Sequence, residues 1–212
     1  MARALPNEDP TNRSLRSAWR ISVVSVVWTL LSSALAITIG VRSGEAALSA
    51  FGAIGFVDAV GSLALSYHFA RALTHEGPSL RLEALAHRVV LGGLLVVGTG
   101  ALVVGAVRLI QNASAGSSTA ALVLAGVSLA VLSALSARKR RVARAVASPA
   151  LRSDSHVTAI GACFAAIALA GTALERWLHL RWADASATVV LGACALALAL
   201  STWRSLGRGE FD

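Results

Sequence analysis

AALSAFGAIGFVDAVGSLALSYHFA, residues 46–70, is long enough to cross a bilayer as a helix, and it carries one carboxylate, Asp58, near its middle. A carboxylate at the centre of a spanning helix costs roughly 2.5 to 3.5 kcal/mol, so it normally faces the interior of the bundle and has a function. Gly55, Asp58, Ser62 and Ser66 follow one another at helical spacing, which places small and polar side chains on one stripe. The stripe predicts a polar path or a close helix contact. The alternative is a structural acid that hydrogen-bonds to a serine or threonine of another helix.

The composition excludes an ordinary soluble domain. Of the 212 residues, 56% are hydrophobic and only 14% are charged, and the mean hydropathy is +0.69. Nineteen Lys and Arg stand against 11 Asp and Glu, but their distribution fits membrane orientation better than nucleic-acid binding, so no nucleic-acid partner is expected. Cys163 and Cys194 both lie in apolar runs, where packing is the expected role and no disulfide framework or zinc knuckle is available.

Six apolar spans predict an all-α, six-helix transmembrane bundle in contact with the lipid bilayer. The spans cover about 21–41, 46–70, 84–110, 119–137, 154–174 and 185–203. They make one domain, residues 18–207, between a tail at 1–17 and a short tail at 208–212. The first apolar run is longer than the core of a secretory signal, so the first helix is expected to remain as an anchor.

The distribution of basic residues predicts the orientation. The N-terminus, the second and fourth loops and the C-terminal tail hold 15 of the 19 Lys and Arg. By the positive-inside rule both termini are cytoplasmic, in a multi-pass protein of the cell (inner or plasma) membrane. The basic run at 138–144 is explained most simply as a topology signal, although it could also contact anionic lipid head groups.

Three stretches carry a family resemblance: SGEAALSAFGAIGFVD (43–58), SARKRRVARAVASPALRSDSH (136–156) and RWADASATVVLGACALALALSTWR (181–204). In order and spacing they resemble the transmembrane domain of the cation diffusion facilitator family of metal/proton antiporters, especially compact six-helix members that lack the cytoplasmic domain. Ala185 stands where the family usually has proline. The resemblance implies a homodimer that exports Zn²⁺ or another divalent cation in exchange for protons, with the metal as cargo and no resident cofactor.

The resemblance also implies where the metal ligands should be. In the family, ligand pairs four residues apart on the second and fifth helices complete a tetrahedral site. These positions fall on Ile54 and Asp58 and on Val157 and Gly161, so only Asp58 is a ligand. One carboxylate does not hold zinc against water, because zinc sites draw on three or four protein ligands.

Other residues near these positions complete the candidate metal or proton site. Asp154 is expected to cap the start of the fifth helix rather than to bind metal. His156 could approach Asp58 across the bundle, and a histidine–aspartate pair would suit proton movement or a looser cation site. Ser62 and Thr158 are possible helpers, although Ser62 is a poor zinc donor. Glu175, His179 and Asp184 form a weaker, peripheral candidate.

Two functions follow from this pattern. The first is a divergent cation-efflux transporter, with Asp58 as the remaining site acid. The second is a non-transporting membrane scaffold or dimer partner whose metal site has been lost. An enzyme is not expected, because no phosphate-binding glycine loop, HExxH motif or nucleophile with a base at a recognisable spacing is present.

Overall fold

The computed structural model describes residues 10–73, 80–116, 118–146 and 149–207, which contain six helices and no strand. The helices are α1 (Pro10–Ser43), α2 (Ala46–Leu73), α3 (Leu80–Ile110), α4 (Thr119–Val146), α5 (Pro149–Leu178) and α6 (Ala183–Gly207). All six are long and apolar enough to cross a membrane. The prediction of an all-α, multi-pass membrane protein is therefore confirmed.

The helices extend beyond the apolar spans that the hydropathy pattern predicts. α1 begins at Pro10 rather than near residue 21, and α4 continues from the expected end at residue 137 to Val146. Arginine, lysine and alanine are good helix formers, so a basic run continues a helix after the apolar segment has ended. α5 begins at Pro149, and proline is favoured in the first turn of a helix. Of the loop predicted between residues 71 and 83, residues 74–79 lie outside the described part of the chain.

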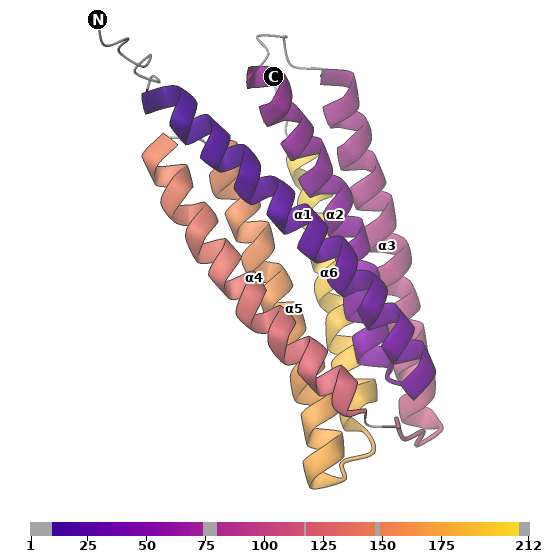
Figure 1. Ribbon diagram of the computed structural model, residues 1–212. Helices are drawn as coiled ribbons and strands as arrows, with labels where there is room; N and C mark the ends of the chain where they lie inside the picture. The colour runs from indigo at the N-terminus through magenta and orange to yellow at the C-terminus, as the bar shows by residue number, and fades with distance from the viewer. Residues whose placement is uncertain (1–9, 74–79, 117, 147–148, 208–212) are drawn as a thin grey trace, which may run out of the picture.

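α2 is the central helix of the bundle. It contacts α1, α3, α5 and α6, while α1 also contacts α4, and α4 contacts α5. α1, α2, α5 and α4 therefore form a ring, and the α3–α6 pair packs against α2 and α5 beside it (Figure 1). This arrangement makes α2 and α5, the two helices that carry the predicted ligand positions, direct neighbours.

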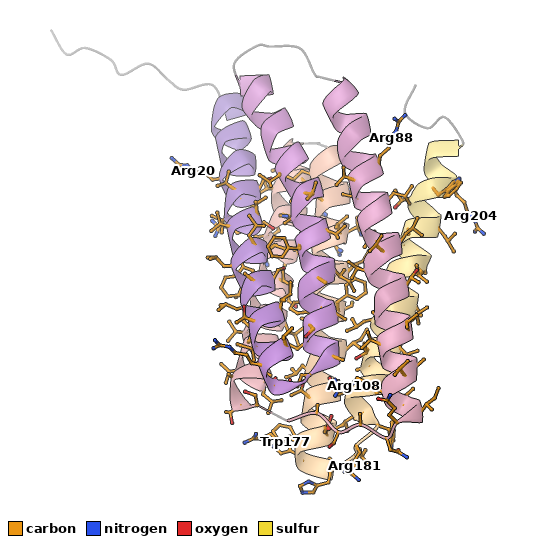
Figure 2. The ribbon with its side chains drawn as sticks, turned by 90° about the vertical axis from the view of Figure 1, so that its right-hand side faces the viewer. Arg20, Arg88, Arg108, Trp177, Arg181 and Arg204 are labelled. Carbon is orange, nitrogen blue, oxygen red and sulfur yellow. The ribbon has the colours of Figure 1, made fainter. Side chains whose placement is uncertain are left out.

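The two ends of the bundle carry different residues. Figure 2 shows Arg20, Arg88 and Arg204 toward the end where α1 begins and α6 finishes, which we call the terminal end. Arg108, Trp177 and Arg181 lie toward the other end, which we call the opposite end.

Large apolar side chains cover the outside of the bundle. Each helix contributes exposed ones, for example Leu31, Phe56, Val96, Val123, Val157 and Val190. Alanines and serines are the commonest residues of the interior, and their small side chains allow helix backbones to approach closely. An apolar exterior around a small-residue interior is the pattern of a bundle whose outer surface contacts lipid.

A close helix crossing joins α3 and α6 at two glycines. A Cβ atom on Gly192 would lie 2.8 Å from the carbonyl oxygen of Gly98 and 2.8 Å from the backbone nitrogen of Leu102. Because these are backbone atoms, neither can move aside as a side-chain tip would. α3 and α6 therefore pack backbone against backbone at this point.

Gly192→Ala should separate the two helices and lower the free energy of unfolding by about 1–3 kcal/mol, the usual range for overpacking. Gly100→Ala is the matched control, because a Cβ there meets nothing within 4 Å. It should be neutral or stabilising by up to about 1 kcal/mol, since alanine is the better helix former. Denaturant unfolding of the purified chain in detergent measures both, and equal effects would contradict the backbone contact.

Candidate functional site: a buried ion pair beside Asp58

The candidate site is centred on a lysine that has no exposed surface. Lys139 of α4 is 0% exposed, and its Nζ lies 2.7 Å from Oδ2 of Asp154 on α5. The same ammonium donates a hydrogen bond of 2.9 Å to Oγ1 of Thr158. The Thr158 hydroxyl in turn donates to the backbone carbonyl of Asp154. The ammonium is thus held by a carboxylate and a hydroxyl that lie one turn apart on α5.

Helical geometry explains why one residue of the basic run turns inward. Lys139 follows Ser136 by three residues and precedes Ala143 by four, and all three side chains are buried. Its neighbours Arg138 and Arg140 lie on other faces of α4 and are exposed. Ser136 also donates a hydrogen bond to the backbone carbonyl of Ser155, which fixes the two helices at this level.

α2 brings a second carboxylate to the ion pair. Asp58 is half-buried and interacts electrostatically with both Asp154 and Lys139. One turn further along α2, Ser62 donates a long hydrogen bond of 3.5 Å to Oδ1 of Asp154. Two carboxylates, one ammonium and two hydroxyls from α2, α4 and α5 therefore gather in one place. We call Asp58, Lys139 and Asp154 the charged cluster.

The charged cluster differs from the site expected from the sequence. Asp154 was expected to cap the fifth helix, but α5 begins five residues earlier, at Pro149, and Asp154 pairs with Lys139 within the helix. Lys139 was counted only among the cytoplasmic loop charges. The signal that could have identified it is the continuation of the small-residue spacing of α4 through Ser136 to Lys139 and Ala143.

His156 does not join Asp58. Asp154 and Thr158 are four residues apart and share the inner face of α5, whereas His156 lies between them in sequence and is exposed. Among the positions of the family's ligands, Val157 is also exposed, at 42% of its surface, and Ile54 is buried at 3%. Gly161 has Leu132 of α4 as its neighbour. None of these residues supplies a polar side chain to the charged cluster.

The described residues bring together no group of three or more His, Cys, Asp or Glu side chains that could hold a metal ion. The charged cluster offers two carboxylates and two hydroxyls, with a lysine ammonium already bound to one carboxylate. Oxygen donors without imidazole or thiolate suit hard cations better than zinc.

A second set of carboxylates closes the opposite end of the bundle. Asp184, in the first turn of α6, caps α2: its two carboxylate oxygens accept hydrogen bonds of 2.9 Å from the amide of Ala46 and 3.0 Å from that of Ala47. Arg108 of α3 lies 3.8 Å from the same carboxylate. One acid thereby joins the ends of three helices.

Glu45 and Glu175 hold the segment between α3 and α4. Glu45 accepts a 2.6 Å hydrogen bond from the amide of Ser118 and a 3.2 Å bond from the hydroxyl of Thr172. Glu175 accepts a hydrogen bond from the amide of Ala115. Glu175 and Asp184 of the predicted peripheral cluster thus both lie at this end, but His179 is exposed and does not complete it. Backbone amides donate hydrogen bonds to these carboxylates, so the role of the carboxylates is structural.

No protein-family model and no curated protein matches the chain. The function therefore has to be argued from the geometry of the site.

Removal of Lys139 should leave Asp154 buried without its cation. Lys139→Met is expected to lower the free energy of unfolding by about 3–5 kcal/mol, the usual result of breaking one side of a buried pair. The double variant Lys139→Met/Asp154→Leu should recover most of this loss, because it removes both charges. Arg138→Met, at the exposed neighbouring position, should stay within about 0.5 kcal/mol of wild type. Equal unfolding curves for Lys139→Met and Arg138→Met in detergent would contradict the buried pair.

Glu45 should make the stability depend on pH. Burial raises the pKa of Glu45 above its ordinary value, and the hydrogen bonds from Ser118 and Thr172 offset this only in part. The folded state therefore holds the proton more tightly than the unfolded state, and the contribution of Glu45 is largest at acidic pH and is lost as the pH rises through the raised pKa.

In Glu45→Gln the amide remains uncharged, so its stability should fall less than that of wild type as the pH rises from the ordinary glutamate pKa of about 4.3 to neutrality. Asp184 and Glu175, the charged groups that interact with Glu45, are unchanged in the variant, as is Arg108 beside Glu175. Melting temperatures measured across this range test the difference. Parallel profiles for the two proteins would show that Glu45 does not titrate there.

Proposed function

We propose that the chain is a proton-coupled membrane transporter of a divalent metal cation, divergent from the cation diffusion facilitators that its sequence resembles. The observation that carries the proposal is the half-buried Asp58 of α2, which interacts electrostatically with the buried Lys139–Asp154 pair of α4 and α5. An intramembrane carboxylate that is neither sealed nor bound to backbone amides is typical of an ion or proton pathway. The carboxylates at the opposite end accept hydrogen bonds from backbone amides, so they are not available to a passing ion in the same way.

Lys139 sets the net charge of the cluster and opposes a bound cation. With both carboxylates ionised the charged cluster carries one net negative charge, so a cation or a proton is needed to neutralise it. A metal cation and a proton compete for the same oxygens of Asp58, which is the basis for exchanging one for the other. When a divalent cation also engages Asp154, the ammonium of Lys139 has to leave that carboxylate, and its repulsion then favours release of the cargo.

The donor atoms of the site limit which cation it can carry. Asp58, Asp154, Ser62 and Thr158 provide oxygen donors alone, and His156 lies on an exposed face of α5. Oxygen-only sites favour Mn²⁺, Mg²⁺ or Ca²⁺ over Zn²⁺. We therefore propose a hard divalent cation, with Mn²⁺ as the probe, in place of the Zn²⁺ that the resemblance first suggests.

The same proposal includes orientation and assembly. The excess of arginine near the terminal end supports cytoplasmic termini, which makes the transport an efflux from the cytoplasm. The resemblance to the family supports a homodimer.

The scaffold hypothesis has one observation in its favour. The ion pair between Lys139 and Asp154 neutralises one of the two carboxylates of the cluster without any cargo, as a purely structural pair would. A scaffold would need the cluster only for folding. Flux measurements separate the two functions.

Sealed vesicles that contain the purified chain and an internal pH dye should show proton movement when a Mn²⁺ gradient is applied, and less movement with Zn²⁺. Asp58→Asn should lower the initial rate at least tenfold, because the amide cannot exchange a proton at this position, whereas Asp58→Glu should retain part of it. Asp184→Asn, at the amide-bound carboxylate of the opposite end, is the matched control and should keep the ion specificity even where it lowers stability.

Each variant is first checked for correct folding by size-exclusion chromatography in detergent. Absence of metal-coupled proton movement in the wild-type vesicles would refute the transporter and favour the scaffold. Equal rates for wild type and Asp58→Asn would refute the role of Asp58.

A further inference from the structure

A groove of about 510 Å³ lies between α4 and α5. None of the residues that line it belongs to the charged cluster, and Arg140 and Arg141 lie on other faces of α4 than Lys139, so its lining is distinct from the cluster. α4 and α5 are neighbours along the bundle, with α4 at its left edge in Figure 1. The groove has the size of a small-molecule site, roughly 300–1,000 Å³.

Three arginines line one end of the groove. Arg140, Arg141 and Arg144 are exposed and follow one another on the same side of α4, near its terminal end. No carboxylate lines the groove within the described residues. Arg138 is exposed as well, but it does not line the groove. The arginines therefore concentrate positive charge at one end of an open groove.

Small and mostly apolar side chains line the rest of the groove. On α5 it is lined by Ala159, Ala162, Cys163 and Ala166, and on α4 its apolar part reaches Leu129. Small side chains leave the space between the helices unfilled. From Arg140 to Leu129 the helix covers eleven residues, about 16 Å at 1.5 Å per residue. This length matches one leaflet, about half of the roughly 30 Å hydrocarbon core.

We infer that this groove binds an anionic phospholipid, with the phosphate on Arg140, Arg141 and Arg144 and one acyl chain along the small residues of α5. Arginine binds phosphate through two parallel donors, and a basic cluster at the membrane surface attracts anionic head groups. The position fits, because the arginines lie where the apolar span of α4 ends and the apolar part of the groove runs into the span.

The charge of the groove selects a lipid over a second copy of the chain. A symmetric dimer through this face would bring the three arginines of both copies to the same membrane surface, where like charges repel within a Debye length of about 8 Å. A soluble phosphate would use the arginines but not the apolar part of the groove. Only a lipid has both a phosphate for the arginines and an acyl chain for the apolar part of the groove. The inference does not depend on transport, since no residue of the charged cluster lines the groove.

Binding is tested on the full chain in neutral detergent, by native mass spectrometry with phosphatidylglycerol and phosphatidylcholine of identical acyl chains. Phosphatidylglycerol should bind at least tenfold more tightly, and the preference should fall as salt is added. The triple variant Arg140→Gln/Arg141→Gln/Arg144→Gln should lose the preference, because each basic residue contributes roughly fivefold at an anionic surface. Arg138→Gln, the matched control outside the groove, should keep it.

Cys163→Phe tests the apolar part separately, because Cys163 is exposed in the groove and its replacement fills the space without disturbing the buried side chains. It should weaken phosphatidylglycerol binding severalfold while leaving the arginines in place.

Equal binding of the two lipids, or an equal loss in Arg138→Gln and the triple variant, would overturn the inference. Displacement of phosphatidylglycerol by soluble glycerol phosphate, with no effect of Cys163→Phe, would assign the arginines to free phosphate instead. A lipid-free dimer that Cys163→Phe dissociates would assign the groove to a second copy.

Discussion

The pairing of Lys139 with Asp154 is the constraint on which the inner part of the bundle depends. An ammonium with no exposed surface is tolerated only when a carboxylate and further hydrogen bonds replace the water it has lost. Thr158 supplies the further bond, and Ser136 fixes the neighbouring backbone of α5. The pair therefore sets how α4 lies against α5. It also leaves Asp58 of α2 as the carboxylate without a resident cation.

The chain uses buried carboxylates in two different ways. At the opposite end, Glu45, Glu175 and Asp184 accept hydrogen bonds from backbone amides and join the ends of the helices. These bonds hold the carboxylates in fixed positions, and movement of any of them would expose a helix end or a loop. In the charged cluster, the carboxylate of Asp154 is bound instead by the side chains of Lys139 and Ser62, which can change rotamer. The proposed ion exchange belongs to the cluster for this reason.

How much of the site could be predicted differs from residue to residue. Asp58 was predicted because an acid in the middle of a long apolar run is conspicuous. Lys139 was missed because it lies among arginines, where a basic residue is expected to be solvated and where the apolar span has already ended. Asp154 was identified as a residue of interest but was given the role of a helix cap, since the start of α5 at Pro149 was not evident. His156 was a candidate partner of Asp58 and is exposed instead.

The amino-acid sequence by itself determined the class of the protein, because the length and apolarity of six segments depend only on which residues follow one another. It also determined that Asp58 lies within such a segment. Tertiary structure alone decided which charges meet, because the partners of Asp58 come from α4 and α5, whose rotation about their own axes is set by packing. A rotation of 100° per residue separates the inward Lys139 from the outward Arg140, and this difference places one in the charged cluster and the other in the groove between α4 and α5.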